Sequence, residues 1–106
     1  MELHTYSSLN KEFIAEYKNC MTGADVKVVF FNPHTIELKR LEAISNDEVK
    51  KLFGHDDLIV MNKKDEIENF LHSQQYFNSV LLLMSSGNFG GMNLPAIIQF
   101  VLKQTA

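Results

Sequence analysis

Apolar residues follow two kinds of spacing along this 106-residue chain. Some segments place them three or four positions apart, which is the spacing of one face of an α-helix. Others are apolar at nearly every position, which is typical of strands buried on both faces of a sheet. The predicted helices are 9–22, 45–54, 63–75 and the stretch from 94 onward, and the apolar runs are 26–31, 58–61 and 80–84.

Residues that begin or end helices flank these segments. Ser7 or Ser8 can cap the first helix, and Gly23 ends it. Residues 45–48 (SNDE) have the pattern of a capping box, and Gly54 follows where the second helix ends. These signals support the helical interpretation of both segments.

Helices and strands alternate along the whole chain, which predicts an α/β domain with a parallel sheet covered on both faces. Residues 1–4 (MELH) resemble the end of a further strand that begins abruptly, which suggests a domain cut from a longer protein. The length allows one hydrophobic core, so residues 1–106 are expected to form a single domain. Met61 and Met84 lie in apolar runs and are expected in that core.

Residues 32–45 form the least regular connection. The pair Asn32-Pro33 interrupts the first apolar run. His34, Lys39 and Arg40 could make this connection a binding loop, but an exposed crossover with a solvated charged face is the interpretation we favour.

Composition and charge exclude several classes of protein. The net charge of −3, without a run of Lys or Arg, argues against a nucleic-acid surface. No apolar stretch approaches the roughly 20 residues that a membrane span requires, and the first residues do not resemble a signal peptide. One cysteine allows no internal disulfide and favours the cytoplasm. Cys20 falls on the apolar face of the first predicted helix, so we expect a buried thiol rather than a reactive one.

The sequence MSSGNFGGMN (84–93) follows the third apolar run and leads into the last helix. Its glycines lack the spacing of a dinucleotide-binding loop, and no Lys-Ser or Lys-Thr completes a P-loop. Backbone N–H groups in such a loop suit a carboxylate or another anion. The four histidines do not pair at a metal-ligand spacing, and the chain offers no evident nucleophile or acid–base pair. The residues therefore predict binding rather than catalysis.

The stretch VLLLMSSGNFGGMN (80–93) resembles the last strand and loop in the C-terminal domain of the Mur ligases, the ATP-dependent ligases of peptidoglycan synthesis. Residues 84–91 are similar to a Met-Ser-polar-Gly-x-Phe-Gly-Gly loop in the branch of murein peptide ligases. The opening ELHTYSS (2–8) and the stretch GADVKVVFFNP (23–33) resemble two further landmarks of that domain. The resemblance covers nearly the whole chain.

This resemblance implies a Rossmann-like, three-layer αβα domain with a mainly parallel sheet. It also implies that the domain positions an amine substrate, while ATP and Mg²⁺ are bound mainly outside this chain. The complete ligase would activate UDP-N-acetylmuramate as an acyl phosphate and join it to the murein tripeptide L-alanyl-γ-D-glutamyl-meso-diaminopimelate. The partners implied are these substrates and the N-terminal and central domains of the same ligase, without nucleic acid or membrane.

The two matched loops would line the amine-substrate side of the cleft. The implied substrate-binding residues are His4, Thr5, Tyr6, Ser7 and Ser8 in the first loop, and Ser85, Ser86, Gly87, Asn88 and Phe89 in the second. No catalytic, cofactor-binding or metal-binding residue is expected in this chain. Structural alternatives stay open: His4 as a partly buried hydrogen-bonding residue, residues 6–8 as the start of the first helix, and Phe89 as a core side chain beneath the loop.

Two other functions stay open as well. Ligases that add L-alanine carry arginines in the first loop where this chain has Thr5 and Ser8, so a peptide is favoured over free L-alanine. The family's nucleotide loop, metal ligands and carbamylated lysine lie outside this chain, so the chain alone is expected to be inactive. A stand-alone doubly wound binding module is the alternative from another class, but the predicted strand ends lack the acidic pocket of a receiver.

Overall fold

The structure is a computed structural model that describes residues 1–105, with the side chain of residue 105 left aside. It contains five α-helices, two 3-10 helices and two β-strands within that range. Their bounds are α1 Lys11–Ile14, η1 Ala15–Tyr17, β1 Val28–Phe30, α2 Pro33–Leu38, α3 Asn46–Phe53, β2 Ile59–Met61, α4 Lys64–Ser73, η2 Phe89–Gly91 and α5 Leu94–Thr105.

β1 and β2 form a parallel two-stranded sheet in which Val28 lies opposite Ile59. Residues 1–3 run along the other edge of β1, where Glu2 forms an isolated parallel bridge with Phe30. The amide of Glu2 in turn donates to the carbonyl of Met84 (2.9 Å). The start of the chain therefore lies between β1 and the end of the segment 80–84. The sequence suggested that MELH ends a further strand, and the structure shows a single bridge at Glu2 in place of a strand.

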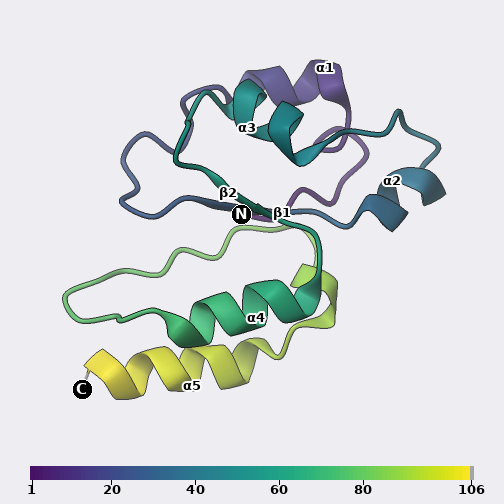
Figure 1. Ribbon diagram of the computed structural model, residues 1–106. Helices are drawn as coiled ribbons and strands as arrows, with labels where there is room; N and C mark the ends of the chain where they lie inside the picture. Colours follow the sequence, from purple (N-terminus) through teal and green to yellow (C-terminus); the bar gives the residue numbers. More distant parts are fainter. Residues whose placement is uncertain (106) are drawn as a thin grey trace.

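β1 is buried on both faces, which explains its continuous run of apolar residues. Successive strand residues point to opposite faces, so Val29 and Phe30 enter different clusters of buried side chains. Figure 1 shows α1 and α3 on one side of the sheet and α4 and α5 on the other. The expected α/β arrangement of helices around a parallel sheet is present, although the sheet has only two assigned strands.

The two clusters have distinct members. The first, between the sheet and α1 and α3, consists of Leu3, Leu9, Ile14, Met21, Val29, Phe31, Ile36, Ile44, Val49, Phe53 and Leu58. The second, toward α4 and α5, consists of Phe30, Ile67, Leu71, Phe89, Met92 and Ile97.

The capping signals of α3 are confirmed. Glu48 N donates to the Ser45 hydroxyl and Ser45 N donates to the Glu48 carboxylate, which completes the predicted capping box. Gly54 ends the helix in the left-handed conformation (φ 76°). The predicted helices 63–75 and 94 onward correspond to α4 and α5.

The predicted helix over 9–22 is largely wrong. Only α1 and the single turn of η1 form, and Asn10 rather than Ser7 or Ser8 caps α1, by accepting from Glu12 N (2.9 Å). The helix stops because Asn19 adopts a left-handed conformation (φ 64°), while its amide donates to the carbonyl of Phe53. A tertiary contact to the end of α3 therefore overrides the local helical spacing.

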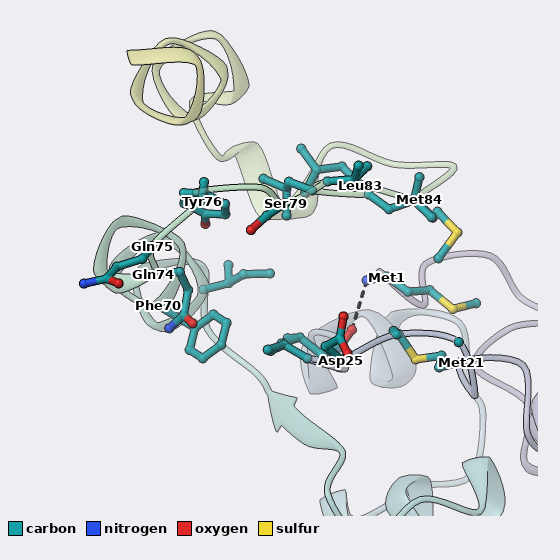
Figure 2. Close-up of a pocket in the computed structure, with 18 of the residues that line it drawn as sticks. Met1, Met21, Asp25, Phe70, Gln74, Gln75, Tyr76, Ser79, Leu83 and Met84 are labelled. Atoms are coloured by element: carbon teal, nitrogen blue, oxygen red, sulfur yellow. Dashed lines mark hydrogen bonds between the residues drawn. The ribbon is translucent and has the colours of Figure 1, made fainter. Parts of the chain in front are cut away.

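The predicted third strand, 80–84, is also wrong as a strand. Its residues alternate between exposed and partly buried, as in an extended chain, and Val80 and Leu82 are exposed. A groove of about 680 Å³ lies between most of this segment and residues 24–28 (Figure 2). Leu81 and Leu83 pack against the second cluster, but within residues 1–105 only Met84 of this segment forms a backbone hydrogen bond to a neighbouring segment. Met84 is exposed, contrary to the expected core position, whereas Met61 is partly buried against the second cluster.

The irregular connection contains a short helix that the sequence pattern missed. Asn32 caps α2 by accepting from the amide of His34 (2.9 Å), and Pro33 occupies the first helical turn. The pair Asn32-Pro33 therefore begins a helix as well as ending the strand. His34 and Arg40 are exposed, as the crossover interpretation predicted. No helix within residues 1–105 is long and apolar enough to cross a membrane.

Cys20 is exposed, so the expectation of a buried thiol is wrong. The helix that would have turned it inward ends before it. Its sulfur is nevertheless partly covered beside the groove, and this desolvation raises the pKa of the Cys20 thiol.

We predict that Cys20 in the native protein reacts fully but slowly with a thiol reagent. A raised pKa leaves less thiolate at a given pH, so the rate should reach half its maximum at a higher pH than for free cysteine. Stopped-flow alkylation across a pH series measures this. A midpoint below that of free cysteine would contradict the prediction.

Candidate functional site

The structure brings the two predicted loops together around a residue that the sequence analysis did not select. The carboxylate of Glu2 accepts hydrogen bonds at Oε1 from the hydroxyl of Ser85 (2.5 Å) and from the amide of Phe89 (2.9 Å). Glu2 immediately precedes the first loop, and Met84, its backbone partner, immediately precedes the second. The backbone hydrogen bond between these two segments therefore places the two loops next to one another.

Glu2 is only 7% exposed. A buried carboxylate is costly unless hydrogen bonds satisfy it, and here the loop supplies two donors to one oxygen. The other oxygen, Oε2, lies 4.0 Å from Nδ1 of His4. Within residues 1–105 no lysine or arginine pairs with this carboxylate. In the sequence, the feature that could have indicated this buried carboxylate is the position of Glu2 between the apolar residues Met1 and Leu3 in a strand-like segment.

Gly87 allows the second loop to approach the first closely. A Cβ at this position would lie 2.9 Å from Cγ of His4 and 3.0 Å from Oε1 of Glu2. The amide of Gly87 also donates to the Ser85 hydroxyl (2.8 Å). This glycine is therefore required by the contact between the loops rather than by an unusual backbone conformation.

The other glycines shape a tight turn. Phe89, Gly90 and Gly91 all have positive φ values (54°, 71° and 85°), and Asn88 closes the turn by accepting from the amide of Gly91 (3.1 Å). The ring of Phe89 is buried and lies 6.5 Å from that of Phe30, centroid to centroid. The alternative of Phe89 as a core side chain beneath the loop is thus confirmed.

The first loop is closed by its own hydrogen bonds. Ser8 is buried, its hydroxyl donates to the carbonyl of Thr5 (3.0 Å), and its amide donates to the Thr5 hydroxyl (3.1 Å). Tyr6 and Ser7 are exposed and line a separate hollow of about 560 Å³ beside α1. Among the predicted first-loop residues, His4 lies close to the glycine loop, with its ring 2.9 Å from where a Cβ of Gly87 would be.

The anion at the predicted anion site is a side chain of the same protein. Donors that an external anion would use, the Ser85 hydroxyl and the Phe89 amide, already bind the internal carboxylate of Glu2. The polar side chains left on the outer surface are His4, which is partly exposed, together with Ser86 and Asn88. These side chains offer hydrogen-bond donors and acceptors, so the outer face suits a polar, hydrogen-bonding ligand.

Two further features bear on the chemistry. Among residues 1–105, no group of three or more His, Cys, Asp or Glu side chains could hold a metal ion. The groove in Figure 2 is mainly apolar, and it shares only Met84 and Phe89 with the region of the glycine loop. Its polar lining residues, among them Gln74, Gln75 and Ser79, belong to neither predicted loop, so we place the candidate site at the two loops.

Comparisons with protein-family models, with curated proteins and with solved structures found no match to this chain.

We predict that Gly87→Ala destabilises the domain by about 1–3 kcal/mol, because the added methyl group has no room against His4 and Glu2. Gly23→Ala is the matched control, since a Cβ there meets nothing within 4 Å and the backbone is not left-handed. Urea unfolding followed by circular dichroism compares the two variants. Equal stability of both would show that the loops do not pack as described.

Proposed function

We propose that this chain is the substrate-positioning C-terminal domain of an ATP-dependent amide-forming ligase of the Mur type. The observation that carries the proposal is the meeting of two loops from opposite ends of the chain on one buried carboxylate. These are the same two loops that the resemblance marks as the amine-substrate side of the ligase cleft. They meet where the parallel segments end, which is where ligands bind in open α/β sheets.

A Rossmann-like, three-layer arrangement is part of this proposal. The segment 80–84, residues 1–3, β1 and β2 lie in that order, and helices flank β1 and β2 on both faces (Figure 1). A fuller sheet would use the same order of segments. The two clusters of buried side chains that separate at β1 correspond to the two interfaces of such a sandwich.

In the proposed reaction, ATP phosphorylates the muramyl carboxylate and the amine of the incoming substrate attacks the acyl phosphate. The products are an amide, ADP and phosphate. The part of this chain that the structure describes has no metal-binding cluster, so we assign ATP and Mg²⁺ to other domains of the ligase. The role of this domain is to hold the amine in position, which lowers the entropic cost of reaction between two bound groups.

The murein tripeptide is the amine substrate we favour over L-alanine. Neither loop contains an arginine, since Arg40 is the only one in the sequence. Thr5 and Ser8, which replace the arginines of the L-alanine ligases, bond to each other. The loops thus lack the bidentate cation that suits the carboxylate of a free amino acid, whereas a peptide offers several polar groups to Ser86, Asn88 and His4.

We predict that the murein tripeptide shifts the amide resonances of residues 85–88 in a ¹⁵N-labelled sample, whereas L-alanine at equal concentration does not. Ser86→Ala should weaken tripeptide binding about five-fold, the loss of one hydrogen bond. Within residues 1–105 the Ser86 hydroxyl forms no hydrogen bond, so the free energy of unfolding should be unchanged.

Ser79→Ala, at an exposed position beside the apolar groove, is the matched control and should bind as the unaltered chain does. Tripeptide-induced shifts confined to the groove, or an absence of shifts, would favour a stand-alone binding module over the ligase domain. Shifts with L-alanine alone would favour the L-alanine ligase.

A further inference from the structure

Glu2 raises a question that the proposed substrate contacts do not answer. It is an acidic residue in a strand-like segment, it is buried, and its nearest basic group is an imidazole 4.0 Å away. An apolar residue at this point of the segment would avoid the cost of burying a charge. The structure must therefore gain something specific from this carboxylate.

The gain lies in the backbone of the glycine loop. Phe89 has a left-handed conformation (φ 54°), which is strained for a residue with a side chain and persists only where its surroundings hold it. Its amide is buried, so this N–H would lack a partner if Glu2 were removed. Oε1 of Glu2 satisfies that amide and at the same time binds the Ser85 hydroxyl, which accepts from the amide of Gly87.

One carboxylate oxygen thus holds three residues of the loop, directly at Ser85 and Phe89 and through Ser85 at Gly87. The same side chain lies beside His4, whose ring packs where a Cβ of Gly87 would be. Glu2 acts on the loop from the inner side, while Ser86 and Asn88 are exposed on the outer side. The inner contacts and the outer surface therefore belong to the same short segment.

We infer that Glu2 is a positioning residue: its carboxylate serves as a built-in hydrogen-bond acceptor that holds residues 85–89 in the conformation that binds the amine substrate. The inference rests on the proposed function for the identity of that substrate. Glu2 does not touch the substrate, because its side chain is covered by the loop it holds.

Three substitutions separate positioning from general stability. Glu2→Gln keeps a carbonyl oxygen for both donors, Glu2→Leu removes the acceptor while filling the space, and Glu2→Ala removes both. The first readout is amide hydrogen exchange at Phe89, and the second is the dissociation constant of the murein tripeptide. Ser45→Ala, which removes the distant cap of α3, is the control for overall loss of stability.

We expect exchange at Phe89 to accelerate about tenfold or more in Glu2→Leu, relative to the global rate, and tripeptide binding to weaken by a similar factor. Glu2→Gln should retain most of the protection at Phe89 and most of the affinity for the tripeptide. Ser45→Ala should change neither quantity. Formate added to Glu2→Ala should restore protection at Phe89, because it supplies the missing carboxylate; formate added to Glu2→Leu should have no effect.

Unchanged exchange at Phe89 in Glu2→Leu would overturn the inference. An acceleration in Glu2→Gln as large as that in Glu2→Leu would overturn it too. If Glu2→Leu does not fold, Ser85→Ala tests the other arm of the network, because it removes the hydroxyl through which Glu2 reaches Gly87 and leaves Phe89 its acceptor. Exchange at the Gly87 amide should then accelerate, and unchanged exchange there would overturn the inference. If the unaltered chain binds no tripeptide, the proposed substrate is wrong, but exchange at Phe89 still decides whether Glu2 positions the loop.

Discussion

The buried carboxylate of Glu2 is the interaction on which the candidate site depends. It ties the beginning of the chain to a loop more than 80 residues later, through one hydroxyl and one amide. A charge removed from water is stable only when donors surround it, and the glycine loop provides those donors. The loop and the carboxylate thus require each other: without Glu2 the left-handed Phe89 loses the partner of its amide, and without the two donors of the loop Glu2 would be a buried charge with no hydrogen bond.

β1 provides the second constraint, because it separates two clusters of buried side chains. Its burial on both faces explains why the sequence pattern predicted the parallel sheet correctly, because a nearly continuous apolar run such as residues 26–31 is typical of a strand covered on both faces. The capping box and Gly54 likewise predicted α3, since these signals act through local hydrogen bonds. Periodicity failed at 9–22, where a contact between Asn19 and Phe53 ends the helix, and at 80–84, where pairing depends on a distant edge of the chain.

The site was predictable only in part. The resemblance selected both loops, and the sequence suggested an anion at the glycines, but nothing in a linear pattern shows that the anion is a side chain of the same protein. Ser8 and Phe89, which the resemblance marks as substrate-binding, are buried: Ser8 closes the first loop and Phe89 packs in the second cluster. His4, Ser86 and Asn88 remain on the surface. Their position in space depends on contacts between the ends of the chain, which local spacing does not encode.

The central claim is that the two loops form one site around Glu2, and the contact between His4 and Gly87 tests it most directly. The imidazole lies against the α-carbon of Gly87, so close that a Cβ would be 2.9 Å from Cγ. A nuclear Overhauser experiment on the unaltered chain should therefore show strong cross-peaks between the His4 ring protons and the α-protons of Gly87. Absence of these cross-peaks, with both residues assigned and the amides of α3 protected, would show that the loops are apart and contradict the account.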